Sequence, residues 1–384
     1  MHKLRALGIT GKLGRWILVF IRNRRQVVMV RGRSSMESIL KSGVPQGSVM
    51  GPLLFLIFIS DLGEGVDASV LIYIDDSKVK KAVKNEESVE DLQENLDKIY
   101  NWEQQNNMKF NGGKFQVLRY GPNKLLKENT SYFTGNMEDV IDQVNNVKDL
   151  GVILSDNAKF EDQIEKVCKK ARQKSGWVMR TFFSRDPEFM RHMYNTLVQP
   201  HLDYCSQLWA PQEGKQMENI ENVLRNYSSR IPRLQNQNYW ERLKTLKLNS
   251  MQRRIERYKI IYTWKVLEGL VPNCGIESMK SERRGRLCQV PRHKSQVTSV
   301  QSLRESSFQI NGPKLFNELP RDLRKKTKCG VEEFKMILDE FLQKIPDQPK
   351  CPGLTPVAQK PDATHSNSLL YQLAWARREG QLRD

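Results

Sequence analysis

Two adjacent carboxylates, Asp75 and Asp76, are the residues of this chain whose types and placement most directly indicate chemistry. They stand between two short runs of β-forming residues, Val70–Ile74 and Ser77–Lys80, which predicts a hairpin with both carboxylates at its tip. Two negative charges this close repel each other unless a cation lies between them, and Mg²⁺ or Mn²⁺ binds carboxylate oxygens together with substrate phosphates. The pair therefore indicates a divalent-metal site, although taken alone it also suits an ordinary surface turn.

A second motif, Ser42–Ser48, lies upstream of this pair and reads Ser-Gly-Val-Pro-Gln-Gly-Ser. It leads into the apolar segment Val49–Leu62, where Ser48 is placed to cap a helix and Pro52 is tolerated near the helix start. Because this segment is apolar on nearly every face, we expect it to be a buried helix. A Gly/Pro turn that caps a core helix is the structural alternative for the motif.

Taken together, the two motifs resemble the paired polymerase motifs of LINE-type (non-LTR, jockey-like) reverse transcriptases. The resemblance rests on Ser-Gly-Val-Pro-Gln-Gly-Ser-x-x-Gly-Pro-Leu-Leu-Phe at residues 42–55, followed by Tyr-x-Asp-Asp at residues 73–76. Weaker similarities follow in the family's order and extend over nearly the whole chain, at residues 101–114, 147–152, 198–205, 239–244 and 312–320.

The resemblance implies an RNA-directed DNA polymerase whose partners are an RNA template and a DNA primer, or an RNA–DNA hybrid. Asp75 and Asp76 would bind two Mg²⁺ (or Mn²⁺) ions that activate the primer 3′-hydroxyl and steady the leaving pyrophosphate. Lys114 would add positive charge near the leaving group, although an exposed lysine at the start of a strand is an equally good interpretation. The residues expected to contact template or nucleotide are Pro45, Gln46, Gly47 and Tyr73.

The fold class expected from this resemblance and from the sequence pattern is α+β, a partial polymerase palm followed by mostly α-helical regions. The palm (residues 1–155) would hold a mixed sheet with helices, the loop at 42–52 and the hairpin at 70–80. A basic helical thumb (156–265), a C-terminal helical region (266–344) and a disordered tail (345–384) would follow. The strands and helix expected within the palm are 26–31, 35–41, 88–105, 115–120 and 147–154.

The charge balance indicates a polyanionic partner. Lys and Arg number 62 against 44 Asp and Glu, which gives a net charge of +18. Such an excess favours nucleic-acid binding, because each neutralised phosphate releases condensed counterions, although a merely soluble basic protein is the alternative. The residues expected to contact the nucleic-acid backbone share one predicted helix and are Lys166, Lys169, Lys170, Arg172 and Lys174.

Cysteine spacing and hydropathy bear on metal binding and on where in the cell the protein is expected. The six cysteines include no C-x₂-C pair, and no H-x₃₋₅-H pair accompanies them, so the pattern does not indicate zinc. The apolar runs Trp16–Ile21 and Leu53–Ile59 are too short for a signal peptide or a membrane span. We expect an intracellular protein in a nuclear or cytoplasmic ribonucleoprotein, neither secreted nor bound to a membrane, and the sequence predicts no oligomeric state.

Three departures from the family pattern bear on activity. The family's palm carries a third aspartate on a strand before the segment matched by Lys3–Ile9, and this sequence contains no counterpart. Ile74 and Phe115 stand where the family usually has small side chains. We therefore expect this chain to be catalytically incomplete by itself, with a non-catalytic RNA- or DNA-binding remnant of a decayed or domesticated element as the alternative.

Overall fold

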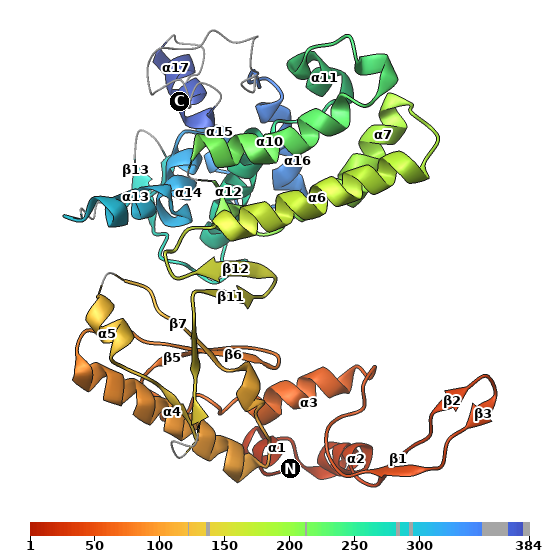
Figure 1. The fold of residues 1–384 in the computed structure, drawn as a ribbon, viewed down its shortest axis with the longest axis vertical. Helices are drawn as coiled ribbons and strands as arrows, with labels where there is room; N and C mark the ends of the chain where they lie inside the picture. The colour runs from red at the N-terminus through yellow and green to blue at the C-terminus, as the bar shows by residue number, and fades with distance from the viewer. Residues whose placement is uncertain are drawn as a thin grey trace. The chain divides into compact units, whose positions relative to one another are not determined.

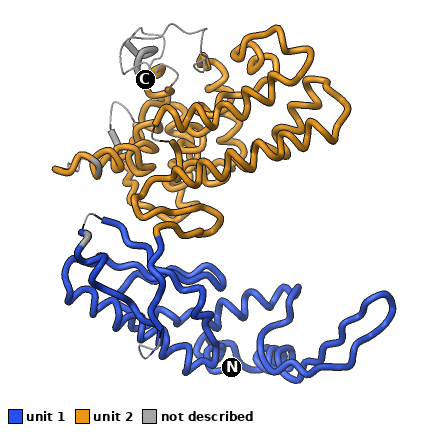
Figure 2. The backbone as a smooth tube through the Cα atoms, viewed as in Figure 1, with its two compact units in different colours: residues 1–144 blue, residues 145–384 orange. Residues whose placement is uncertain are grey.

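The computed structural model describes residues 1–121, 123–135, 139–211, 213–281, 285–291, 295–347 and 368–378 (Figure 1). They form two compact units, residues 1–144 and 145–384, coloured separately in Figure 2. Both helices and strands are present, so the α+β class is confirmed. No helix in the described ranges is both long enough and apolar enough to cross a membrane.

The first unit begins with two helices and an extended arm. Helices α1 (His2–Ala6) and α2 (Gly11–Ile21) are separated by a break, where Gly8 and Gly11 adopt φ values of +78° and +63°. The arm contains β1 (Arg24–Gln26) paired antiparallel with β4 (Ser38–Leu40). Farther out, β2 (Met29–Val30) pairs with β3 (Arg33–Ser34), so the two expected strands are each interrupted.

The segment Val49–Leu62 forms a helix, α3 (Met50–Ile59), but the expectation that this helix is buried is wrong. It buries Leu54 and Ile59, but Leu53 and Leu56 are 51% and 46% exposed. An apolar residue on every face requires neighbours on every side, and the described part of this unit covers only part of the helix surface.

The rest of the first unit packs around helix α4 (Glu86–Asn106), which buries Ile99 and Trp102. The helix begins two residues before the expected range 88–105, and Asn85, which precedes it, forms a reciprocal capping box with Ser88. The remaining elements are β5 (Ser69–Tyr73), β6 (Asp76–Lys80), η1 (Gly112–Lys114), β7 (Gln116–Leu118), α5 (Lys124–Glu128), β8 (Phe133–Thr134), β9 (Asp139–Val140) and β10 (Asp142–Val144).

Strand pairing differs from the single mixed sheet that was expected. Among the described residues every sheet has two strands: β5 pairs with β6 and β8 with β9, both antiparallel, while β7 and β10 pair in parallel. Each pair has unpaired edges, because no third strand joins it in the described ranges.

The second unit opens with a hairpin where one strand was expected. Strands β11 (Asn146–Asp149) and β12 (Val152–Ser155) pair around Leu150 and Gly151, whose φ values are +43° and +90°. The expected palm boundary at residue 155 would divide the chain after this hairpin, whereas the compact units divide before it.

Two apolar cores organise the second unit. The first involves α6 (Glu161–Thr181), α7 (Pro187–Met193), η2 (Tyr194–Val198), α8 (Gln199–Asp203), α9 (Ser206–Trp209), α10 (Gly214–Ser228), η3 (Pro232–Leu234) and α11 (Tyr239–Leu246). The second core forms on α12 (Met251–Leu267), β14 (Gly285–Cys288), α14 (Phe308–Asn317), α15 (Arg321–Arg324), α16 (Val331–Leu342) and α17 (Leu369–Arg378). Strand β13 (Ser278–Ser281) pairs with β14, and α13 (Thr298–Ser306) precedes α14, so the expected helical region also contains a hairpin.

The expected disordered tail is wrong for two described segments. In residues 345–347, Pro346 accepts a hydrogen bond from Arg253 through its carbonyl oxygen, at 3.0 Å. In residues 368–378, helix α17 buries Leu369 and Leu373 completely. Burial of these leucines overrides the polar, proline-rich composition on which the expectation was based. The rest of that prediction, at 348–367 and 379–384, lies outside the described residues.

Candidate active site and nucleic-acid interface

The carboxylate hairpin forms as expected. Tyr73 pairs with Asp76, so Ile74 and Asp75 make a two-residue turn and Asp76 opens strand β6. Both carboxylates and Tyr73 are exposed. Within the part of the chain that the structure describes, no group of three or more His, Cys, Asp or Glu side chains could hold a metal ion. The hairpin thus supplies two adjacent oxygen ligands of the kind Mg²⁺ prefers, but not a complete set.

The turn at the carboxylates is strained. Ile74 has φ +57°, in the left-handed region that costs an L-residue about 1–2 kcal/mol and that β-branched residues rarely adopt. A two-residue turn of this kind normally has glycine at its first position. Ile74 was singled out for its size, and the structure adds a backbone reason for a small residue there.

Hydrogen bonds from Arg24 hold the start of the loop at 42–52 in place. Arg24, at the start of β1, donates through Nη2 to the carbonyl oxygens of Ser42 and Gly43, at 3.0 and 2.6 Å. Gly43 and Gly47 have φ values of +81° and +79°, which non-glycine residues adopt only with strain. Sequence reasoning missed Arg24, since nothing in its own segment indicates a partner in the loop.

The turn into α3 is also fixed within the loop. The Ser48 hydroxyl donates to the carbonyl oxygen of Pro45 at 2.6 Å and accepts from the Gly51 amide at 3.0 Å, as its predicted capping role requires. A Cβ atom at Gly51 would lie 2.8 Å from the Pro45 oxygen, so a side chain there is excluded unless the backbone moves. Gln46 and Gly47 are exposed at the outside of this turn.

Asp61 has a structural role at the end of the α3 segment. Its Oδ1 accepts hydrogen bonds from Lys3 Nζ at 2.6 Å and from Trp102 Nε1 at 2.7 Å. Burial acts to raise the pKa of this carboxyl, but these two donors outweigh it and lower the pKa below its usual value. The Lys3 ammonium also lies 4.9 Å from the ring centres of Phe58 and Trp102. Asp61 therefore ties α1 to α4 through its Oδ1.

Lys114 and Phe115 lie at the end of η1 and just beyond it. Phe115 packs in an aromatic cluster, with ring centres 5.5 Å from Tyr100 and 6.1 Å from Phe110. Lys114 is exposed beside this cluster. Among the described residues no hydrogen bond or ion pair joins Lys114, the 42–52 loop and the Asp75–Asp76 hairpin to one another, so their grouping into one site stays a prediction.

Comparison with known proteins finds a family match for the first part of the chain. The sequence model described as reverse transcriptase (RNA-dependent DNA polymerase) matches residues 1–154, the region that contains both the loop and the hairpin. Residues 1–154 are therefore similar to the reverse transcriptase family, and the chain is homologous to RNA-directed DNA polymerases of mobile elements.

Related polymerases come from mobile elements of flies. The chain is 26% identical over 231 residues to the probable RNA-directed DNA polymerase from transposon BS of Drosophila melanogaster. It is 27% identical over 223 residues to the RNA-directed DNA polymerase from mobile element jockey of Drosophila funebris. Each alignment covers 55% of this chain and 24% of the relative, so the chain spans about a quarter of the length of the relatives it matches.

Beyond the matched reverse transcriptase region, α6 carries a basic face. Lys166, Lys170 and Lys174 are four residues apart and so share one side of the helix. Burial, with the charges of Lys148 and Lys170, lowers the pKa of Lys166. Burial, with the charges of Lys170 and Lys174, likewise lowers the pKa of His201. Lys148 on β11 and His201 on α8 therefore lie near enough to these lysines for their charges to interact, and the sequence pattern pointed to neither residue.

Two other predicted contacts on α6 have different surroundings. Arg172 donates through Nη2 to the side-chain and carbonyl oxygens of Asn219 on α10, so its guanidinium is engaged within the unit. Lys169 is exposed. Trp177, which is 42% exposed, has the Lys174 ammonium 5.5 Å from its ring centre. The basic face therefore ends in an accessible aromatic ring.

Several basic residues of α12 are buried or ion-paired within the second unit and do not face a ligand. Arg253 is fully buried, and Lys259 is 8% exposed. Arg254 forms a two-bond ion pair with Asp203 of the 198–205 segment, Nε–Oδ1 2.8 Å and Nη2–Oδ2 2.6 Å. Burial raises the Asp203 pKa, and Arg254 opposes that shift. This ion pair ties the 198–205 segment to α12.

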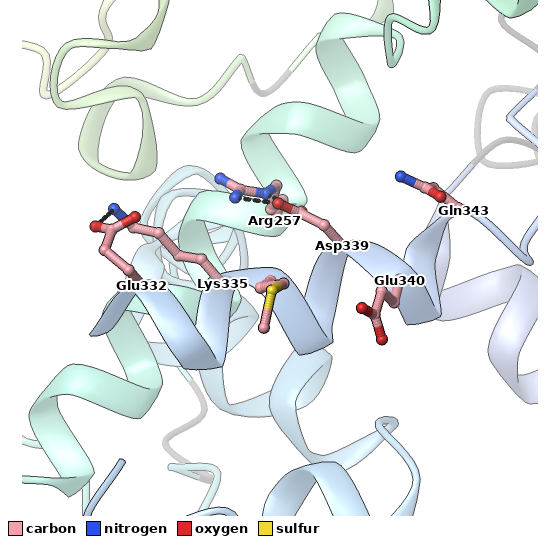
Figure 3. Close-up of a pocket in the computed structure, with 7 residues that line it drawn as sticks. Arg257, Glu332, Lys335, Asp339, Glu340 and Gln343 are labelled. Carbon is pink, nitrogen blue, oxygen red and sulfur yellow. Dashed lines mark hydrogen bonds and ion pairs between the residues drawn. The ribbon is translucent and has the colours of Figure 1, made fainter. Parts of the chain in front are cut away.

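One open pocket lies between α12 and α16, with a volume of about 350 Å³. Figure 3 shows its cations already paired: Arg257 Nη2 lies 2.6 Å from Asp339 Oδ2, and Lys335 Nζ lies 2.6 Å from Glu332 Oε1. Each positive charge has a carboxylate partner, so the pocket carries no unpaired cation that would attract an anionic ligand. It contains none of the reverse transcriptase motif residues.

Proposed function

We propose that residues 1–154 form part of the catalytic domain of an RNA-directed DNA polymerase of a non-LTR retrotransposon. The observation that carries the proposal is the Asp75–Asp76 hairpin, with two adjacent exposed carboxylates inside a region that matches the reverse transcriptase family. The substrates would be deoxynucleotides, an RNA template and a DNA primer, or an RNA–DNA hybrid. These partners are proposed for this chain from its family alone.

Each site residue has a proposed role. Asp75 and Asp76 would hold Mg²⁺ (or Mn²⁺), since hard divalent cations bind carboxylate oxygens. When bound, such ions lower the pKa of the primer 3′-hydroxyl and neutralise charge on the leaving pyrophosphate. Lys114 would add positive charge beside that leaving group. The template or nucleotide would contact Pro45, Gln46, Gly47 and Tyr73.

Metal binding tests the assignment of the hairpin. In the full chain, an Asp75→Asn/Asp76→Asn double variant should lose Mn²⁺ binding measured by electron paramagnetic resonance. Asp67→Asn is the control, because the Asp67 side chain is 79% exposed and lies outside the hairpin. Equal Mn²⁺ binding by the wild type and the double variant would contradict the assignment.

We further propose that these 384 residues do not extend a primer by themselves. Two carboxylates from one hairpin fix two metal ions poorly, and no third carboxylate joins them among the described residues. Because phosphoryl transfer depends on positioning, the lack of a third ligand removes most of the rate. Primer extension on poly-riboadenylate with Mg²⁺ should show no incorporation. Incorporation that disappears on Asp75→Ala would contradict incompleteness while supporting the polymerase assignment.

A second candidate function is nucleic-acid binding without catalysis, supported by the basic face of α6. Lys166, Lys170 and Lys174 would contact phosphates, together with Lys169 and a partly engaged Arg172. Binding of an RNA–DNA hybrid should survive Asp75→Ala but weaken in a Lys170→Ala/Lys174→Ala variant. The slope of log affinity against log salt should fall by about 0.9 for each phosphate that the variant no longer neutralises. Binding that is insensitive to salt would exclude this function.

A further inference from the structure

The arm between α2 and α3, residues 24–40, is the most exposed ordered element of the first unit. Every residue from Arg25 to Ile39 is exposed, and Figure 1 shows the arm standing away from the helices of this unit. Val28, Met29, Val30, Met36 and Ile39 are 53–92% exposed. An isolated two-stranded hairpin is marginally stable in water, so an apolar ribbon of this kind indicates a binding partner.

Charge indicates what that partner is. The arm holds Arg24, Arg25, Arg31 and Arg33 against one acidic residue, Glu37. Arg24 is bound to the 42–52 loop, and Arg25 Nη1 pairs with Glu37 at 3.2 Å. Among the described residues no acidic group pairs with Arg31 or Arg33. These two arginines therefore carry the uncompensated positive charge, which favours a polyanion.

The geometry of the tip presents both arginines together. Arg31 and Gly32 have φ values of +49° and +79°, so Val30–Arg33 is a tight turn of the type preferred in hairpins. A left-handed arginine costs about 1–2 kcal/mol relative to an ordinary conformation. Strain of this kind persists where the surrounding structure imposes it, often at a ligand-binding position.

The aliphatic character of the arm selects between classes of nucleic acid. Unpaired bases bind proteins mainly by stacking on aromatic rings, and residues 22–41 contain none. A two-stranded ribbon has strands about 5 Å apart and fits the major groove of B-form DNA, which is about 12 Å wide. There arginines contact phosphates, and apolar side chains lie against the sugars and the groove floor.

We propose that the arm, through Arg31 and Arg33 at its tip, is a binding element for double-stranded nucleic acid. The inference rests on the arm alone, so it stands or falls independently of metal binding and primer extension. A second copy of the chain is the competing occupant, and mutual repulsion of the arginines opposes it.

The test is equilibrium binding of the full chain, followed by fluorescence anisotropy at several salt concentrations without nucleotides or divalent ions. The probes are a DNA duplex, an RNA–DNA hybrid of the same sequence and the separate single strands. Arg31→Ala/Arg33→Ala should bind duplex about tenfold more weakly, and its salt slope should fall by about 1.8, because two phosphates are no longer neutralised. The size of the effect on each duplex identifies which one the arm binds.

Two further variants make the test decisive. Arg304→Ala/Lys326→Ala removes the same charge from exposed positions of the second unit and should leave the slope unchanged. Replacing residues 28–36 by Asn-Gly closes the arm after β1 and should reproduce the weaker binding. Unchanged duplex affinity in both arm variants, or weakening confined to single strands, would overturn the proposal. So would arm-dependent self-association with unchanged duplex affinity, measured by sedimentation.

Discussion

At the scale of single residues, the tip of the β5–β6 hairpin places the proposed metal ligands beside a strained residue. Ile74 holds φ +57° directly beside Asp75, so the turn that presents the carboxylates is built on an unfavourable residue. Relief of a left-handed conformation is worth about 1–2 kcal/mol, while a glycine costs about 0.5–1 kcal/mol in chain entropy. The first effect is the larger, so glycine should stabilise the hairpin.

Ile74→Gly should therefore slow hydrogen exchange of the β5–β6 amides about fivefold, corresponding to roughly 1 kcal/mol. Leu71→Gly is the matched control, because Leu71 lies within strand β5 and is 48% exposed. Glycine at that position should accelerate exchange, since it only weakens the strand. Equal or faster exchange in Ile74→Gly would show that the turn is not strained.

At the scale of elements, the docking of α17 depends on both a core and a cap. Leu369 and Leu373 are fully buried, and Glu256 on α12 accepts hydrogen bonds from Ser368 Oγ at 2.9 Å and the Leu369 amide at 3.0 Å. Leu373→Ala should cost about 2–5 kcal/mol locally and release the helix to proteolysis. Tyr371→Ala is the control within the same helix, since Tyr371 is 56% exposed. Equal protease resistance of both variants would contradict this docking.

Local patterns allowed several elements to be predicted, and tertiary partners explain the failures. The hairpin at Asp75 and the Ser48 cap each depend on neighbouring residues, so both could be predicted from the sequence. The exposure of Leu53 and the burial of Leu373 depend on which distant elements cover them, which no local pattern contains. The hydrogen bonds from Arg24 to the 42–52 loop could not be predicted for the same reason.

At the scale of the whole molecule, the two units differ in how much apolar surface they bury. The clusters of the first unit contain four and three buried residues among those described, whereas the second unit has two extended cores. Large apolar side chains of the first unit are also exposed, among them Val19 on α2, Met36 on the arm, Leu53 on α3 and Leu71 on β5. Its two-stranded sheets leave unpaired edges, which template association between chains.

Expressed separately, residues 145–384 should unfold cooperatively as a monomer, while residues 1–144 should bind a hydrophobic dye and aggregate. The physical reason is that the first unit buries too little apolar surface on folding to offset the loss of conformational entropy. Circular-dichroism melting and size-exclusion chromatography of both fragments make the measurement. High salt distinguishes the two possible causes of aggregation. Aggregation through apolar edges should persist in high salt, whereas electrostatic association is screened. A sharp, reversible melt of residues 1–144 as a monomer would mean that the exposed apolar side chains do not limit its stability.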